Sequence, residues 1–205
     1  MKLYIVRHGE TYGNINGDGF SETDLTPRGE KQIFLLGERF KDEKIDRFYT
    51  SPLIRAVKTT LAVKAHHPNT KITIDSLLLE KGTDPHYCGL PQNDLLKLCP
   101  EAEIGNLSPL GTETDKEAYV RATKIIKKIK EENPFDSTVM IIAHGTFNNF
   151  LVMAATGIPL TENFNFSHVN TGVSLVRYVK ENGKIQAKLK YGNSFYHLLD
   201  DPPEL

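Results

Sequence analysis

Short, largely apolar runs alternate with helical patterns along this chain, and the alternation restricts the fold more than any other feature. The runs have the length of strands covered on both faces, and they occupy residues 3–6, 45–50, 71–74 and 137–143. Apolar residues recur at helical spacing between and after them, over residues 26–40, 51–61, 113–132 and 146–156. Two further strand-like runs flank an Asn-Gly pair that is typical of a hairpin, at residues 172–179 and 184–191. We therefore predict a three-layer α/β sandwich, with a mainly parallel central sheet, helices on both faces and an antiparallel C-terminal hairpin.

The length of 205 residues predicts one domain spanning residues 1–205. Within it, residues 80–111 lose all periodicity and are punctuated by Gly and Pro, which predicts an irregular excursion that covers a functional site. Thr26 is the expected N-cap of the first long helix, with Pro27 at its first position. Ser51, followed by proline, repeats this signal and is expected to cap the next helix.

Charge and composition argue against some binding partners and indicate the redox environment. A formal net charge of −1 gives no reason to expect binding to nucleic acid or to an anionic membrane, and no apolar run approaches membrane-spanning length. The two cysteines, Cys88 and Cys99, cannot form a disulfide framework, and they favour free thiols in the cytoplasm. The sequence leaves open whether the protein is a monomer or a homodimer.

Chemically active side chains lie shortly after the carboxyl ends of the four predicted strands of the parallel sheet. Arg7 and His8 follow the first strand, and Arg55 lies in the first turn of the helix after the second. Glu80 comes shortly after the third strand and His144 directly after the fourth. Because ligands of open α/β sheets bind at the carboxyl ends of the strands, we expect these five side chains to face one edge.

Of the chemistries that such a set could perform, phosphate chemistry fits best. A zinc site would need closely spaced ligands, whereas these are scattered and accompanied by two arginines that would repel a dication, so no metal is expected. The chain has neither the G-x-S-x-G turn of serine hydrolases nor the G-x-x-x-x-G-K-[ST] loop of nucleotide-binding proteins. Guanidinium groups match phosphate oxygens, and a neutral imidazole can attack phosphorus.

The order of these segments resembles the histidine phosphatase superfamily, in the branch that contains the cofactor-dependent phosphoglycerate mutases. The resemblance covers nearly the whole chain, and it is carried by "VRHGETYGN", "LTPRGEKQ", "YTSPLIRAVKTT", Glu80, "IIAHGT" and "NTGVSLVRY".

The resemblance implies a role for each residue. His8 would be the nucleophile that forms a phosphohistidine, and Glu80 would give a proton to the leaving oxygen and later take one from water. Contacts to the phosphoryl group are implied for Arg7, Asn14, Arg55, His144 and Gly145. Arg7, Arg55 and His144 thereby also belong to the catalytic set. The resemblance implies neither a metal nor another cofactor, and the expected ligand is a small phosphorylated metabolite.

Several alternatives remain open at the level of sequence. Asp84 is a second candidate for the proton donor, because the segment after Glu80 departs from the pattern usual in the family. A mutase must shield its phosphohistidine from water, and the short stretch between "AATGIPL" and "NTGVSL" favours a phosphatase instead. A protein that binds a phosphorylated ligand without turnover is the third reading.

Overall fold

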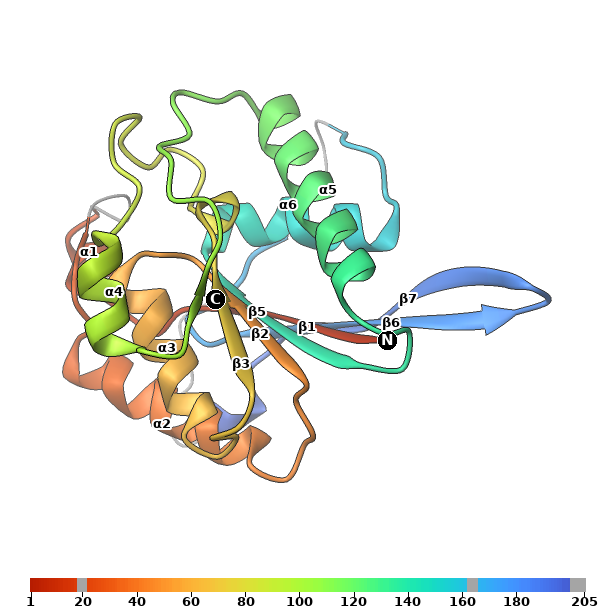
Figure 1. The fold of residues 1–205 in the computed structure, drawn as a ribbon, viewed down its shortest axis with the longest axis horizontal. Helices are drawn as coiled ribbons and strands as arrows, with labels where there is room; N and C mark the ends of the chain where they lie inside the picture. The colour runs from red at the N-terminus through yellow and green to blue at the C-terminus, as the bar shows by residue number, and fades with distance from the viewer. Residues whose placement is uncertain (18–21, 162–165, 200–205) are drawn as a thin grey trace.

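The computed structural model describes residues 1–17, 22–161 and 166–199, and these contain one sheet in the order β4-β3-β2-β5-β1-β6-β7 (Figure 1). Five strands run parallel: β1 (Lys2–Arg7), β2 (Arg47–Thr50), β3 (Lys71–Ile74), β4 (Glu103–Ile104) and β5 (Thr138–Ala143). The other two, β6 (Val173–Glu181) and β7 (Lys184–Ser194), form an antiparallel hairpin next to β1. The predicted α/β class and its mainly parallel sheet are confirmed.

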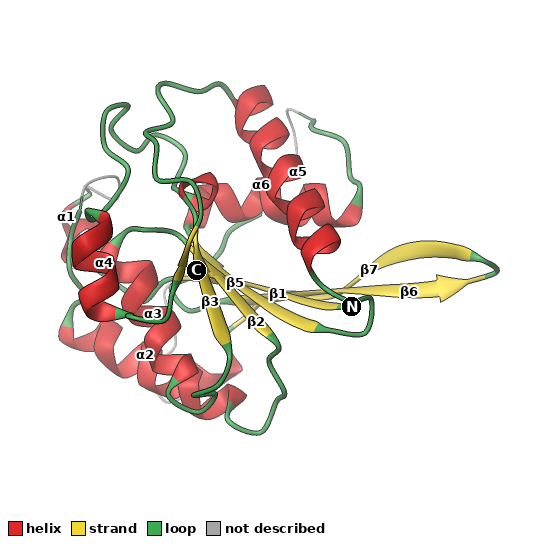
Figure 2. Cartoon of the chain, viewed as in Figure 1, coloured by secondary structure: helices red, strands yellow, loops and turns green. Residues whose placement is uncertain are grey.

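Helices cover both faces of the sheet, which makes the three layers visible in Figure 2. One layer contains α2 (Pro27–Phe40) and α3 (Ile54–Lys64), and the opposite layer contains α5 (Asp115–Glu132) and α6 (Gly145–Thr156). The shorter helices are α1 (Tyr12–Asn16), η1 (Ser76–Leu78), α4 (Gln92–Leu98) and η2 (Tyr196–Leu198). Over the described ranges, no helix combines the length and the apolar character needed to cross a membrane.

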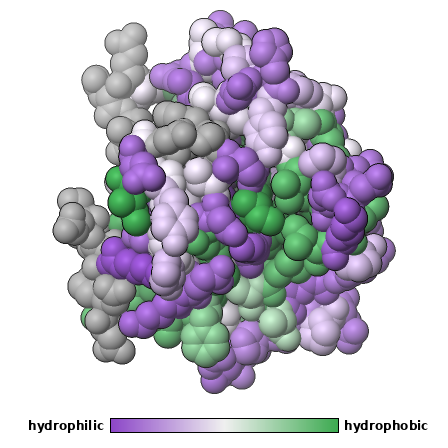
Figure 3. Space-filling model, turned by 90° about the vertical axis from the view of Figure 1, so that its left-hand side faces the viewer, coloured by the Kyte–Doolittle hydropathy of each residue, from purple (hydrophilic) through white to green (hydrophobic). Residues whose placement is uncertain are grey.

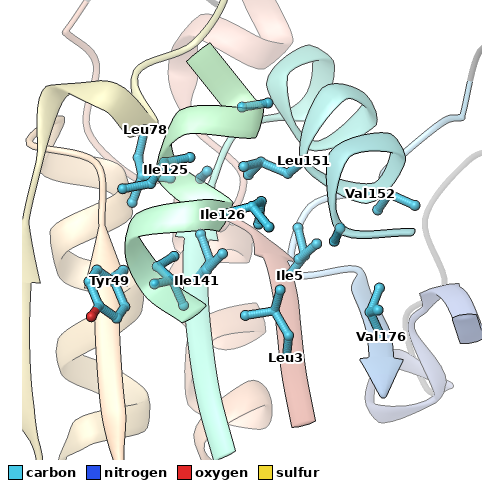
Figure 4. Packing of buried hydrophobic residues seen from close by; sticks show 14 of the residues in the cluster. Leu3, Ile5, Tyr49, Leu78, Ile125, Ile126, Ile141, Leu151, Val152 and Val176 are labelled. Carbon is cyan, nitrogen blue, oxygen red and sulfur yellow. The ribbon is translucent and has the colours of Figure 1, made fainter. Parts of the chain in front are cut away.

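The middle residues of β1 and β5 are largely apolar because both faces of these strands are buried. Leu3 and Ile5 of β1 contact the layer of α5 and α6, beside Ile141 of β5 (Figure 4). Tyr4 and Val6 belong to the second core cluster, on the α2 and α3 side. Burying one such aliphatic side chain contributes about 1.5–3 kcal/mol to folding stability. The two clusters therefore make the sheet a rigid support for the side chains at the carboxyl ends of its strands.

The helix starts agree with the sequence in one case and differ in the other. Thr26 is the N-cap of α2, its Oγ1 accepts a bond of 2.9 Å from the Gly29 N–H, and a proline begins the helix, as predicted. The prediction for Ser51 is wrong, because α3 begins only at Ile54 and no side chain of the residue before it forms a cap. Instead, the Ile54 N–H donates to the carboxylate of Glu22 at 2.6 Å, so a distant segment satisfies the first N–H of the helix. The Ser51 Oγ accepts only a long bond of 3.4 Å from the Leu53 N–H.

The segment 80–111 is more regular than predicted. It contains α4, whose Leu95 is fully buried in the core, and the edge strand β4, which pairs with β3. A seven-residue helix and a two-residue strand are too short to produce a readable period. The segment also passes close to the start of α3, since a Cβ at Gly89 would lie 2.7 Å from the Pro52 carbonyl oxygen.

The predicted hairpin is confirmed. Asn182 and Gly183 connect β6 to β7 with φ angles of 51° and 75°, the left-handed conformation that a two-residue turn of this kind requires at both positions.

Candidate active site

A cavity of about 340 Å³ opens at the carboxyl ends of the parallel strands. Figure 3 shows this side of the molecule, where hydrophilic residues cover much of the surface and hydrophobic residues lie between them. The cavity is lined, among others, by Arg7, His8, Asn14, Glu80, Gly145 and His168. Arg55 and His144 are almost completely buried. The charge of Arg55 acts on the His8 ring, and the His144 ring lies beside it. The structure thus brings the residues singled out in the sequence to one edge of the sheet.

His8 is held in a single orientation at the end of β1. Its ring Nδ1 lies 2.7 Å from the Gly9 carbonyl oxygen, and because a carbonyl only accepts, the proton is on Nδ1. Nε2 therefore carries the lone pair. Burial lowers the pKa of His8 well below its usual 6.5, and the positive charges of Arg55 and Arg7 lower it further, so the neutral form prevails at physiological pH.

Arg7 crosses the start of α6. Its Nη1 donates to the His168 carbonyl oxygen at 2.6 Å, which fixes the direction of the guanidinium. A Cβ at Gly145 would lie 3.3 Å from the Arg7 Cζ, so the absence of a side chain at position 145 lets the arginine lie against the helix. Burial lowers the pKa of Arg7, but an arginine remains charged at neutral pH.

His144 and Arg55 are almost fully buried and are not among the residues that line the cavity. The His144 Nε2 is 2.8 Å from the Ser51 hydroxyl, and the ring centroids of His144 and His8 are 5.1 Å apart. Burial lowers the pKa of His144 well below 6.5, and the charge of Arg55 adds to this effect. Burial also lowers the pKa of Arg55, against the influence of the Glu22 and Glu80 carboxylates. The result is a neutral imidazole between cationic groups.

Glu80 faces the first turn of α6. Its Oε1 accepts the N–H of Phe147 and of Lys81, both at 2.8 Å, and its Oε2 accepts the N–H of Thr146 at 3.0 Å. Burial raises the pKa of this carboxyl above its usual 4.5, although the three N–H donors act in the opposite direction. A carboxyl with a raised pKa that is held in place by the backbone is suited to giving and taking a proton.

The structure places Asn14 and Asp84 differently. The Asn14 side chain lines the cavity, and its amide oxygen accepts bonds of 3.1 Å from the Thr11 N–H and from the Asn170 side chain. Asp84 is exposed, does not line the cavity, and accepts a bond from the His86 N–H within its own turn. Of the two candidate acids, Glu80 is the one beside His8.

The segment "LTPRGE", residues 25–30, supports the loop after β1. A Cβ at Gly29 would lie 2.0 Å from the Glu10 carbonyl oxygen, so only glycine lets α2 approach this loop. The Glu10 carboxylate accepts the Thr26 hydroxyl at 2.7 Å and pairs with Arg28 at 3.3 Å. These contacts keep the segment that carries His8 rigid.

Sequence reasoning missed several residues that shape the site. Ser51 contacts His144, the His168 carbonyl orients Arg7, and the Asn170 side chain donates to the His8 carbonyl oxygen at 3.1 Å. Thr171 adopts a left-handed φ of 57°, and its N–H donates to the His8 carbonyl oxygen at 3.2 Å. The available signal was the segment "NTGVSLVRY", which is part of the family resemblance and contains Asn170 and Thr171. The left-handed φ of Thr171, which marks a constrained position, is visible only in the structure.

Among the described residues, no group of three or more His, Cys, Asp or Glu side chains is arranged to hold a metal ion. The positive charge in the cavity comes instead from arginine.

The buried histidines predict a pH-dependent stability. Burial lowers the pKa of His168 and of His197 to about 3, and lowers those of His8 and His144 as well. Below pH 6.5 the unfolded chain therefore binds more protons than the folded one, and stability is lost as the pH falls from 6.5. The raised pKa of Glu80 acts in the opposite direction, but it is a single group. The four histidines are joined by His67, whose pKa burial also lowers.

We expect the free energy of unfolding, measured with urea between pH 6.5 and 5, to fall by up to about 1.4 kcal/mol per pH unit for each such histidine. His168→Asn should make this slope shallower. His86→Asn, which removes an exposed histidine, should not. Equal slopes in the wild type and His168→Asn would contradict the expectation.

Comparison with known proteins agrees with this geometry. The sequence matches the histidine phosphatase superfamily (branch 1) over residues 3–189. Phosphoserine phosphatase 1 of Hydrogenobacter thermophilus is 25% identical over 197 residues, 92% of each chain. The 2,3-bisphosphoglycerate-dependent phosphoglycerate mutase of Bartonella bacilliformis is 25% identical over 199 residues, 91% of this chain and 96% of the relative.

Solved structures show the same fold. A mycobacterial glucosyl-3-phosphoglycerate phosphatase in complex with VO3 superposes with a TM-score of 0.71 at 20% identity, over 94% of this chain and 99% of the other. The α-ribazole phosphatase from Shigella flexneri gives a TM-score of 0.71 at 23% identity, over 95% and 97%. The sequence match spans all the strands that carry the site, and this chain therefore belongs to the histidine phosphatase superfamily, branch 1.

Proposed function

We propose that this protein is a phosphatase that hydrolyses a small phosphomonoester through a phosphohistidine on His8, without a metal or another cofactor. The observation that carries the proposal is the hydrogen bond from the His8 Nδ1 to the Gly9 carbonyl, because it leaves Nε2 unprotonated in a cavity lined by Arg7 and Glu80. A nucleophile, a cation and an acid then surround one small space.

In the first step, the His8 Nε2 attacks phosphorus and the bond from phosphorus to the leaving oxygen breaks. Glu80 protonates that oxygen as it departs. Arg7 and Arg55 neutralise the charge on the phosphoryl oxygens, with Asn14, Gly145 and His144 as further contacts. Positioning alone supplies up to about 7–11 kcal/mol of barrier reduction in such reactions, and a well-placed donor adds about 3–4 kcal/mol. Phosphoryl transfer needs little else.

In the second step, water attacks the phosphohistidine. Glu80, now ionised, takes the proton from this water, the bond between phosphorus and Nε2 breaks, and inorganic phosphate leaves. The phosphorylated ring carries a positive charge, since Nδ1 keeps its proton, and this makes neutral His8 a good leaving group. The cycle returns every group to its starting state.

Relatives with phosphatase names support hydrolysis, whereas the mutase relative makes isomerisation the second candidate. The short connection between α6 and β6 favours hydrolysis. Only residues 157–172 link the two elements, which leaves little chain to exclude water from the phosphohistidine while a substrate reorients.

The choice is tested by following both reactions at once. With 3-phosphoglycerate and a trace of the bisphosphate, in chelator, we expect phosphate release to exceed formation of 2-phosphoglycerate. A parallel screen of sugar, nucleotide and glycerate phosphates should find a substrate that is hydrolysed faster. Isomerisation faster than phosphate release would replace the phosphatase with a mutase, and tight binding with neither reaction would indicate a non-catalytic phosphate-binding protein.

The proposed setting is the cytoplasm, with the protein as a monomer or a homodimer. Both Cys88 and Cys99 are free thiols in the structure, which is compatible with a reducing compartment.

A further inference from the structure

The backbone that leads from β3 to Glu80 is bonded to α5 through one buried arginine. The Arg121 Nη1 donates to the carbonyl oxygens of Leu77 and Leu79, both at 2.9 Å. These carbonyls lie three residues and one residue before Glu80. The side chain of Arg121 is only 6% exposed, so it makes these bonds away from water, where they are strongest.

A carboxylate completes the arrangement around this guanidinium. Glu113 accepts a bond of 3.0 Å from the Arg121 Nε and a second bond from Nη2, a bidentate pair that fixes the plane of the guanidinium. The Glu113 side chain is 9% exposed. Because Nε, Nη1 and Nη2 are all bonded to protein groups, Arg121 is built to hold the chain rather than to bind a ligand.

The same guanidinium supports Glu80 from its other side. The Arg121 Cζ lies 3.7 Å from the centroid of the Phe147 ring, and the Phe147 N–H donates to the Glu80 Oε1 at 2.8 Å. Between the two bonded carbonyls, Leu78 packs into the core beside Ile125 of α5 (Figure 4). One side chain thus contacts both the backbone that carries Glu80 and the residue that anchors its carboxylate.

We propose that Arg121, bound to Glu113, is a positioning residue that sets the place of the Glu80 carboxyl relative to the leaving oxygen. The inference rests on the proposed function, since it concerns the acid of the first step. Lys at position 121 would keep the charge, but its single ammonium group cannot bind two carbonyls and a carboxylate in one plane. Glu80 would then shift while His8, which directly follows β1, stays in place.

A matched control lies two turns along the same helix. Lys128 pairs with the buried carboxylate of Asp75 at 2.8 Å, and so also ties the segment before Glu80 to α5, but five residues upstream of it. Loss of this pair should lower stability without moving Glu80.

The experiment compares Arg121→Lys and Glu113→Gln with Lys128→Met by rapid quench. In each, the rate of phosphohistidine formation is measured with an alkyl phosphate, whose leaving oxygen needs a proton, and with p-nitrophenyl phosphate, whose leaving oxygen does not. We expect Arg121→Lys and Glu113→Gln to slow the burst about 10²-fold with the alkyl phosphate, the cost of a displacement of about 1 Å, and to leave the nitrophenyl burst close to the wild-type rate. Lys128→Met should keep the wild-type ratio.

A second comparison separates positioning from general damage. Introduced into Glu80→Gln, Arg121→Lys should add no further dependence on the leaving group, because the group that it positions is already disabled. The inference is overturned by an equal slowing with both substrates, by the same change of ratio in Lys128→Met, or by unfolding of both Arg121→Lys and Glu113→Gln where Lys128→Met folds. Absence of a phosphohistidine in the wild type would instead reject the proposed function itself.

Discussion

Replacement of His8 by alanine should lower kcat on the order of 10⁶-fold, the size of loss that follows removal of a covalent nucleophile. The side chain that would be lost is the one whose Nε2 faces the cavity unprotonated. Rapid quench with ³²P-labelled substrate should trap acid-labile, base-stable label on the wild-type protein and none on the variant. The label should form in the presence of chelator.

His86→Asn is the matched control, because it removes an exposed histidine that does not line the cavity. It should label as the wild type does. Label on another residue, or label that forms only when a divalent cation is added, would reject the mechanism. A His8→Ala variant that still turns over at an appreciable rate would do the same.

Replacement of Glu80 by glutamine should produce the second largest effect, and one that depends on the substrate. An alkyl phosphate departs as an alkoxide, which must be protonated, whereas nitrophenolate is stable without a proton. General acid catalysis is typically worth about 10²–10⁴-fold, so the burst of phosphohistidine should slow by this factor with an alkyl phosphate and change little with p-nitrophenyl phosphate.

The pH profile gives an independent test of Glu80. Burial raises the pKa of Glu80 and lowers that of His8, so both shifts favour the reactive state, with neutral imidazole and protonated carboxyl. Activity on alkyl phosphates should therefore fall on the alkaline side of the Glu80 pKa, and Glu80→Gln should remove this limb. Asp84→Asn should change neither the limb nor the burst. If Asp84→Asn, and not Glu80→Gln, slows the burst with the alkyl phosphate alone, Asp84 is the acid.

Much of this fold could be predicted because its central strands are buried on both faces. A strand of this kind reads as an unbroken apolar run, and the residue that follows it lies at the carboxyl edge of the sheet whatever the helices do. This reasoning predicts Arg7, His8 and His144 as site residues. The short elements α4 and β4 leave no such pattern, because packing against the rest of the molecule, and not local periodicity, makes them regular.

The parts of the site that sequence could not provide are contacts between distant segments. Ser51 has the local signature of a helix cap, yet its hydroxyl meets His144, 93 residues away, because Glu22 satisfies the start of α3 instead. The carbonyl that orients Arg7 belongs to His168, 161 residues away. A backbone carbonyl carries no residue-type signal, so only the folded arrangement shows which one acts.

The hydrogen bond from the His8 ring to the Gly9 carbonyl makes the tautomer of His8 resistant to mutation. In many enzymes a carboxylate side chain selects the tautomer of a catalytic histidine, and a single codon change can remove it. Here the selecting group is the peptide carbonyl of Gly9, which every amino acid would retain. Substitution can reach it only by displacing the peptide, as a Cβ at Gly9 would do by lying 2.6 Å from the Ile33 Cγ2. Evolution can therefore vary the walls of the cavity widely while the reactive nitrogen of His8 stays the same.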